Sequence, residues 1–255
     1  MFENLFNIEK KTFLVTGGSS GIGLVAVEVL ASRKANVIIV GRSEDKLKSA
    51  IKNLNEKGFS TVSYKVCDIS DINDVKALES EISDIPIDGF INSAGMVIRK
   101  ELLDISDEEF KSVVDVDFYG AFYIGRIIAR NMIKHNTRGK MVFILSTGAF
   151  KAAIRYGSYS AAKAGVNMLA KTFALELAKY GITCNTLAPT ATNTPLTKAM
   201  YDANPKRLQE VIMNHPIGRI AEPEDYAGAL LYLMSPASDF MTGEMIVVDG
   251  GKCAK

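Results

Sequence analysis

Thr16-Gly17-Gly18-Ser19-Ser20-Gly21-Ile22-Gly23 is the stretch of this sequence that decides the fold. It stands between a β-rich run at Thr12–Thr16 and a helical pattern at Ile22–Ser32. In a strand–loop–helix unit of this kind, backbone N–H groups and the positive end of the helix meet the pyrophosphate of a dinucleotide. Glycine is needed because a Cβ atom would block the tight turn and the approach of phosphate. The residues expected to line such a site are Gly17, Ser19, Ser20, Gly21, Ile22 and Gly23.

Beyond this loop, short β-rich runs alternate with helical patterns along the chain. Several runs are apolar at consecutive positions, which is typical of strands covered on both faces. The alternation predicts an α/β fold, a Rossmann-type doubly wound parallel sheet of about seven strands with helices on both faces. The expected strands are Thr12–Thr16, Asn36–Val40, Thr61–Val66, Asp88–Asn92, Lys140–Leu145, Ile182–Leu187 and Glu244–Val248. The expected helices are Ile22–Ser32, Asp45–Asn55, Ile72–Ile82, Asp107–Lys134, Tyr159–Lys179 and Pro223–Leu233.

Length and hydrophobic content predict a single domain. The 255 residues, 47% of them hydrophobic, are enough for one large core, so we expect one cofactor-binding domain over 1–255. The stretch Ala188–Glu222 has weak periodicity and is rich in Thr, Pro and Asn. We expect residues 189–222 to form a mobile substrate lid, the alternative being an ordinary surface excursion.

Charge and cysteine content exclude several classes of partner. Thirty basic and twenty-nine acidic residues give a net charge of +1, which predicts no binding to nucleic acid or an anionic membrane. Neither a long apolar run nor a signal peptide in Met1–Lys11 is evident. The three cysteines are far apart, and His135 and His215 are isolated, so we expect a cytoplasmic protein without a metal site. Surface or loop roles are the default for both histidines.

The end of the second expected strand predicts which dinucleotide binds. An NAD-binding chain would place an acidic residue there, against the ribose 2′-hydroxyl. This sequence has Arg42 and Ser43 instead. The guanidinium fork suits a 2′-phosphate, and Ser43 can add a hydrogen bond, so we expect NADP(H). The alternative is that Arg42 is a solvated residue at the start of the next helix.

A candidate catalytic group consists of three residues in the second half of the chain. Tyr159 and Lys163 are four residues apart, which places them one turn apart on one helix face. A nearby ammonium lowers the pKa of a phenol and prepares it for acid/base work. Ser146 ends the preceding strand, where its hydroxyl can hold a substrate oxygen as charge develops there. Alternatively, Ser146 serves only the local backbone.

These motifs together resemble the short-chain dehydrogenase/reductase superfamily over nearly the whole chain. The resemblance rests on the glycine loop and on Cys67-Asp68-Ile69, Asn92-Ser93-Ala94-Gly95, Ser146, Tyr159 with Lys163, Asn185, Pro189 and Val248-Asp249-Gly250-Gly251. It implies that Lys163 also binds the nicotinamide ribose and that the protein is a homotetramer. The further cofactor contacts that it implies are Asp68, Ile69, Asn92, Ala94, Gly95, Tyr159, Pro189, Thr192 and Thr194. Met96–Lys100 and Tyr180–Ile182 are similar to sugar-acid dehydrogenases of the gluconate 5-dehydrogenase type.

The sequence departs from the family pattern at three positions. Ser93 replaces a frequent Asn, and Thr190 replaces the Gly that usually follows Pro189. Asp117 stands in place of an Asn that in the family orders a water leading to Lys163. If ionised, Asp117 would stabilise the Lys163 cation and change the proton path, so it joins the candidate catalytic residues.

The leading hypothesis is therefore an NADP(H)-dependent oxidoreductase acting on a ketone or secondary alcohol, such as a sugar acid, polyol or other small carbonyl compound. A 3-oxoacyl thioester reductase shares every one of these residues and stays open. A third alternative, motivated by Asp117 and Thr190, is an NADP-binding sensor or scaffold that has lost turnover.

Overall fold

The computed structural model describes residues 4–254, apart from the side chains of residues 199 and 200, and contains one parallel sheet. Its seven strands lie in the order β3-β2-β1-β4-β5-β6-β7, which confirms the predicted fold class. Residues 1–3 and 255 of the expected domain lie outside the described residues. The strands are β1 (Thr12–Thr16), β2 (Asn36–Gly41), β3 (Val62–Val66), β4 (Gly89–Asn92), β5 (Lys140–Ile144), β6 (Thr183–Pro189) and β7 (Met245–Val248).

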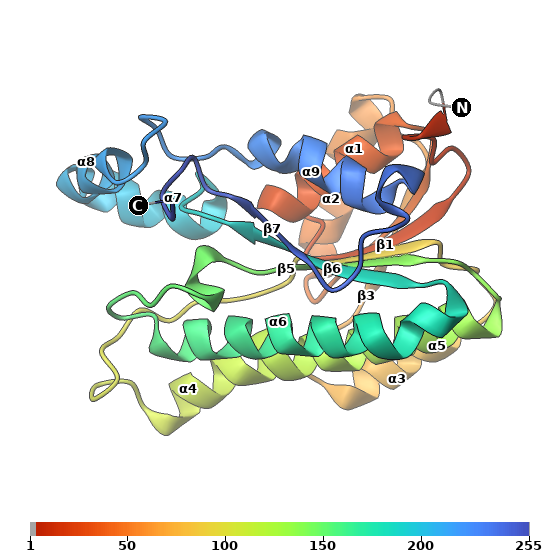
Figure 1. The fold of residues 1–255 in the computed structure, drawn as a ribbon, viewed down its shortest axis with the longest axis horizontal. Coiled ribbons are helices and arrows are strands. Elements are labelled where there is room, and N and C mark those ends of the chain that lie inside the picture. The colour runs from red at the N-terminus through yellow and green to blue at the C-terminus, as the bar shows by residue number, and fades with distance from the viewer. Residues whose placement is uncertain (1–3, 255) are drawn as a thin grey trace.

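Helices cover both faces of this sheet (Figure 1). On one face lie α1 (Gly21–Ser32), α2 (Glu44–Glu56) and α9 (Ala227–Met234). On the other lie α3 (Ile72–Glu81), α4 (Asp107–Val114), α5 (Gly120–Lys134) and α6 (Gly157–Leu177). Two more helices, α7 (Pro195–Ala203) and α8 (Pro205–Met213), lie together at one end of the molecule.

The strand residues alternate between two hydrophobic cores, because successive side chains of a strand point to opposite faces. Phe13 and Val15 of β1 pack with α1 and α9, whereas Leu14 packs with the core beneath α3, α5 and α6. In that second core Phe143 of β5 stacks on Phe173 of α6, with ring centroids 6.1 Å apart. Burial on both faces explains why these strands are apolar at consecutive positions.

The sheet order fixes where a ligand can bind. β1 pairs with β2 on one side and with β4 on the other, so the chain reverses its direction of winding between β1 and β4. In doubly wound sheets, ligands bind beyond the carboxyl ends of the strands at this switch point. The glycine loop follows β1, so it stands at that point.

Two segments differ from the sequence expectation. The helix expected over Asp107–Lys134 is interrupted by a π-helical turn at Asp115–Tyr119, which has no signature in hydrophobic periodicity. The segment expected as a lid contains two helices, α7 and α8, that are not among the helices expected from the sequence. Both begin with proline at the first helical position, and Asn204 caps α8 by accepting a hydrogen bond from the Arg207 N–H (3.1 Å).

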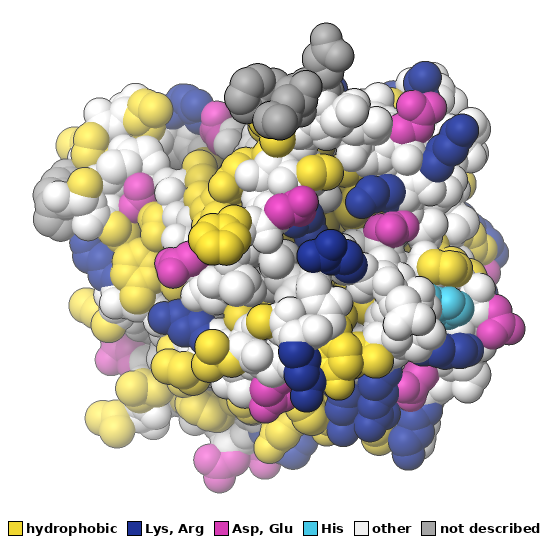
Figure 2. All heavy atoms as spheres, turned by 45° about the vertical axis from the view of Figure 1, so that its right-hand side comes forward, with side chains coloured by type: hydrophobic (Ala, Val, Ile, Leu, Met, Phe, Trp, Pro, Cys, Tyr) yellow, Lys and Arg dark blue, Asp and Glu magenta, His cyan; other side chains and the backbone are white. Residues whose placement is uncertain are grey.

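The surface carries both signs of charge. Figure 2 shows basic, acidic and hydrophobic side chains interspersed on one face, in keeping with a net charge of +1. Within residues 4–254, no helix is long and apolar enough to cross a membrane. The same residues hold no group of three His, Cys, Asp or Glu side chains able to bind a metal ion.

Candidate active site

A cavity of about 960 Å³ opens beyond the carboxyl ends of β1 to β6. Most residues expected to meet the cofactor line it, including the glycine loop and both residues that follow β2. Those lining the cavity are Gly17, Ser19, Ser20, Gly21, Ile22, Arg42, Ser43, Asp68, Ile69, Ala94, Gly95, Tyr159, Lys163, Pro189, Thr192 and Thr194. Gly23 and Asn92 are buried behind the wall, so any contribution from them is through the shape of the loop.

The glycine loop has the geometry of an anion cradle. Gly17 has φ +67°, and a Cβ atom there would lie 2.8 Å from the Ala94 nitrogen. The Thr16 hydroxyl fixes the loop from below by donating to Asn92 Oδ1 (2.7 Å) and accepting from the Ala94 N–H (3.3 Å). Ser20, the N-cap of α1, makes no side-chain capping bond, and the first turn of α1 has no acidic residue. The N–H groups of that turn are therefore left for an anionic ligand.

The end of β2 presents two cations to the cavity. Arg42 is exposed, and within residues 4–254 it makes no ion pair. Lys46, in the first turn of α2, also lines the cavity. Sequence reasoning missed Lys46. The helix start at Glu44 puts Lys46 in this turn, and both it and Arg42 line the cavity. The Ser43 oxygen accepts from the Lys46 N–H (3.5 Å), so its hydroxyl proton stays free to be donated to a ligand.

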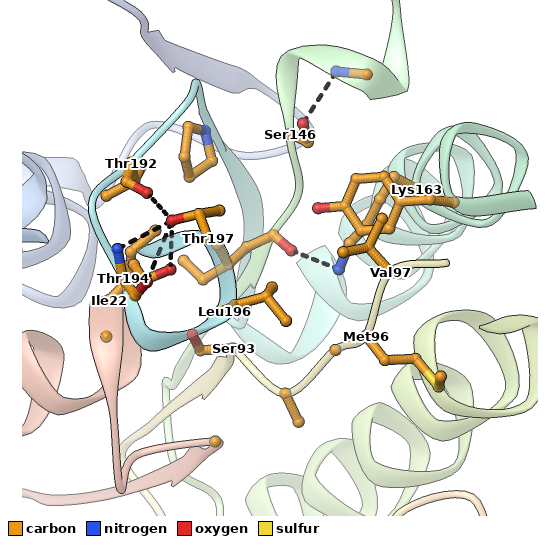
Figure 3. A pocket seen from close by; sticks show the side chains of 18 of the residues that line it. Ile22, Ser93, Met96, Val97, Ser146, Lys163, Thr192, Thr194, Leu196 and Thr197 are labelled. Atoms are coloured by element: carbon orange, nitrogen blue, oxygen red, sulfur yellow. Dashed lines mark hydrogen bonds between the residues drawn. The ribbon is translucent and has the colours of Figure 1, made fainter. Parts of the chain in front are cut away.

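Ser146 and Lys163 lie on the opposite side of the cavity from the 192–197 segment (Figure 3). Tyr159 lines the same cavity. Ser146 caps a short 3₁₀ turn after β5, where its oxygen accepts from the Gly148 N–H (3.1 Å). This is the local backbone role weighed as the alternative for Ser146, but it uses only the oxygen and leaves the hydroxyl proton. Tyr159 lies in the first turn of α6, and the Lys163 amino group is 5.5 Å from the centroid of its ring.

Asp117 forms a buried ion pair with Lys163. The distance from Asp117 Oδ1 to Lys163 Nζ is 2.8 Å, and the two side chains are 0% and 6% exposed. Asp117 Oδ2 accepts from the Met96 N–H (2.9 Å), and Lys163 also donates to the Ile144 carbonyl (3.2 Å). Gly95 makes the approach possible, because a Cβ there would lie 2.7 Å from Asp117 Oδ1. The carboxylate thus contacts Lys163 directly rather than through a water.

Burial and the neighbouring charges have opposing effects on the pKa values of Tyr159 and Lys163. For Tyr159, burial raises the pKa, the Lys163 charge lowers it, Asp117 raises it and the Ser146 hydroxyl lowers it, with a net rise. For Lys163, burial lowers the pKa, but the charges of Asp117 and Tyr159 and the hydrogen bond to Asp117 together raise it, with a net rise. Lys163 is therefore held as a cation, while the phenol needs further positive charge nearby to ionise.

The outer part of the cavity is lined by aromatic and basic side chains that sequence reasoning missed. Arg99 Nε donates to the Tyr156 hydroxyl (2.7 Å), and the Tyr156 ring meets the Tyr159 ring edge-on at 6.3 Å. Tyr201 of α7 is buried, which raises its pKa, as does nearby Tyr156, while Arg99 and Arg207 lower it. Among the lining residues that the structure describes, Asp68 is the one acid. The lining cations are Arg42, Lys46, Arg99, Lys151, Lys163, Arg207 and Lys252.

The segment after β6 forms the remaining wall through a network of threonine hydroxyls. Thr192 donates to the Thr190 carbonyl (2.8 Å), and Thr197 donates to the Thr192 carbonyl. Thr190 in turn is hydrogen-bonded to His215 (2.8 Å). His215 lies in the loop after α8, as one of the two expected roles has it, but not at the surface, because this side chain is only 2% exposed. A lone histidine in a weakly periodic segment gives no signal of that burial.

Known proteins resemble this chain over almost its full length. Residues 17–252 match a family model described as enoyl-(acyl carrier protein) reductase. The 2-dehydro-3-deoxy-D-gluconate 5-dehydrogenase of Formosa agariphila is 34% identical, over 98% of this chain and 96% of the relative. The 3-oxoacyl-(acyl-carrier-protein) reductase of Chlamydia muridarum is 35% identical, over 94% and 96%.

Solved structures agree with the sequence relatives. A gluconate 5-dehydrogenase from Burkholderia cenocepacia, crystallised with NADP and tartrate, superposes with a TM-score of 0.93 at 30% identity. The similarity covers 99% of this chain and 98% of that one. An actinorhodin polyketide ketoreductase with NADPH gives a TM-score of 0.90 at 28% identity, over 95% and 97%. The chain belongs to the short-chain dehydrogenase/reductase family of oxidoreductases.

Proposed function

We propose that this protein is an NADP(H)-dependent oxidoreductase that interconverts a ketone and a secondary alcohol on a small acid. The observation that carries the proposal is one cavity with an anion cradle and Arg42 at one end and the Ser146, Tyr159 and Lys163 group at the other. Such a cavity can hold a dinucleotide along its length and a small substrate beside the phenol. The Burkholderia enzyme with bound NADP supports this choice of cofactor.

Different residues of the chain would bind different parts of the cofactor. The α1 N-terminus and the glycine loop would hold the pyrophosphate, and Arg42 with Lys46 would hold the 2′-phosphate. Asp68 and Ile69 would border the adenine, since both line the cavity beyond β3. When bound, NADP(H) supplies or accepts the hydride at the nicotinamide.

Tyr159 carries out the proton transfer. Ser146 donates its free hydroxyl proton to the substrate oxygen and so stabilises negative charge developing there. Tyr159 gives its phenolic proton to that oxygen during reduction and takes it back during oxidation. Lys163, which is ion-paired with Asp117, stabilises the phenolate form.

The cations of the outer cavity favour an anionic substrate. The bond from Arg99 Nε to Tyr156 orients the guanidinium and leaves its terminal nitrogens for a ligand. The Nε atom of Arg207 is buried without a hydrogen-bond partner in the described structure. A carboxylate can engage a guanidinium through two parallel bonds, and it would compensate this charge. The relatives named for gluconate substrates support a sugar acid.

A 3-oxoacyl thioester reductase is the second candidate, favoured by the Chlamydia muridarum relative and by the description of the matching family model. It would use the same Ser146, Tyr159 and Lys163. It would not need the carboxylate-binding cations near Tyr156, so the choice of substrate separates the two functions.

The first prediction concerns turnover by Tyr159. Tyr159→Phe removes only the hydroxyl, so the packing of the ring is kept. We expect kcat to fall at least about a hundredfold, the lower range for loss of a general acid/base, with NADPH binding unchanged. Tyr180→Phe, in the 3₁₀ turn that follows α6 and outside the cavity lining, is the matched control. A Tyr159→Phe enzyme that retains more than half of the wild-type kcat would contradict the assignment.

The second prediction concerns the choice of cofactor. Fluorescence titration is expected to give tighter binding of NADPH than of NADH, by about ten- to a hundredfold for a charge-assisted contact. Arg42→Asp should invert the order, because a carboxylate repels the 2′-phosphate and can accept from a ribose hydroxyl. Arg33→Asp, which changes the charge of an exposed residue away from the cavity, should not. Equal affinity of the wild-type protein for both cofactors would refute the role of Arg42.

The third prediction concerns the ion pair. Asp117→Asn removes a charge that raises the pKa of both Tyr159 and Lys163. We expect the pKa of Tyr159 to fall and Lys163 to stay protonated, because the ordinary pKa of a lysine is far above neutral and the Asn oxygen can still accept from its ammonium. Alcohol oxidation needs the phenolate, and its rate should therefore rise with pH about one unit earlier than in the wild type. We expect kcat within about tenfold. An unmoved pH profile would mean that the carboxyl is neutral, and a shift to higher pH would mean that Lys163 has lost its proton.

The fourth prediction tests the substrate class and the function as a whole. NADP(H) turnover is measured in both directions with aldonic acids, polyols of equal length, neutral ketones and 3-oxoacyl thioesters. We expect kcat/KM for the acid to exceed that for the polyol at least about tenfold, and Arg99→Gln to remove the difference. Faster reduction of thioesters would favour the second candidate. If no compound is turned over and NADPH still binds, the result would support the alternative of an NADP-binding sensor or scaffold.

A further inference from the structure

The substrate side of the cavity depends on a helix that is weakly held. Arg207 and Val211 of α8 line the cavity, yet none of the described residues of α8 is fully buried. The helix packs mainly against α7, and Met213 at its end is 72% exposed. Little apolar area therefore fixes α8, and a polar contact that ties it to the rest of the wall has a large share in its position.

His215, two residues beyond α8, makes that contact. Its Nδ1 atom is 2.6 Å from the Val211 carbonyl, and its Nε2 atom is 2.8 Å from the Thr190 hydroxyl. A carbonyl can only accept, so Nδ1 carries the proton of a neutral ring and Nε2 accepts from Thr190. The ring is 2% exposed, which shields both bonds from competing water.

Thr190 connects His215 to the cofactor side of the cavity. Its carbonyl accepts from Thr192, whose hydroxyl is also 2.7 Å from the hydroxyl of the fully buried Tyr226. Further along the same segment, Thr194 lies against the glycine loop, since a Cβ on Gly21 would be 3.3 Å from its methyl group. One chain of contacts thus runs from α8 to the anion cradle.

We propose that His215 and Thr190 are positioning residues that fasten the substrate-side helix α8 to the cofactor-side segment 190–194. We name this hydrogen-bonded pair the 190–215 latch. Thr190 is one of the departures from the family pattern, and glycine at this position has no hydroxyl to donate. The latch sets the distance between Arg207 and the site of Tyr159, so it acts on substrate binding rather than on the proton step. Its kinetic role rests on the proposed function, whereas its role in holding α8 does not.

Four substitutions separate the latch from general packing. Thr190→Val removes the hydroxyl at constant shape, and Thr190→Ser keeps it. His215→Asn places an amide near Nδ1, where it can still donate to Val211 but cannot reach Thr190. His215→Gln extends an acceptor toward Thr190 instead. Thr172→Val is the control, because the Thr172 hydroxyl bonds the Met168 carbonyl on the exposed face of α6 (3.1 Å).

The first readout is amide hydrogen exchange of residues 206–213 in the full protein without substrate. We expect Thr190→Val and His215→Asn to speed this exchange at least about fivefold, with β-sheet amides unchanged, and the Ser and Gln variants to stay near wild type. The double variant Thr190→Val with His215→Asn should be no faster than either single one, as holds for two partners in one bond. Additive effects, or unaltered α8 exchange, would overturn the latch.

The second readout is kinetic. With the best substrate from the panel, the latch-breaking variants should raise KM about five- to a hundredfold, the range for a buried hydrogen bond, with kcat within about threefold. A parallel loss of kcat and of thermal stability in all four variants would show a merely structural role and reject the proposal. A wild-type protein without turnover would refute the proposed function, and the exchange experiment would still decide whether the latch exists.

Discussion

A carboxylate and an ammonium held in contact away from water, Asp117 and Lys163, constrain the centre of this molecule. Breaking such a pair by removing one partner commonly destabilises a protein by about 3–5 kcal/mol, so the fold must supply partners for every remaining lone pair and proton. Two of these partners are the Met96 N–H, in the loop after β4, and the Ile144 carbonyl, at the end of β5. The pair thereby ties α6 and the π-helical turn to the edge of the sheet.

The same pair determines what the site can do. Because Asp117 neutralises Lys163 from behind, the ammonium acts on Tyr159 with part of its charge already compensated. Burial opposes the phenolate form of Tyr159 and positive charge favours it. An oxidised nicotinamide bound in this cavity would add positive charge and so favour the phenolate.

Much of the fold was predictable because local chemistry and tertiary structure agree. Thr12–Thr16 and the glycine loop were predicted at their observed positions, since a buried parallel strand and a phosphate turn each restrict the residue types allowed. The parts that escaped prediction depend on contacts between distant residues. His215 is hydrogen-bonded to Thr190, and Arg99 to Tyr156, and neither partner is close in sequence.

The π-helical turn at Asp115–Tyr119 has a consequence for the length of this segment. Each residue of a helix turns the chain by about 100°, so the extra residue of the π turn sets the rotation between α4 and α5. Deleting one residue would close the backbone into a regular helix, but either Asp117 would swing away from Lys163 or the buried face of α5, with Ile124 and Ile128, would leave the core. Insertions and deletions here are therefore excluded even where substitutions are tolerated, and the segment acts as a fixed spacer between core and site.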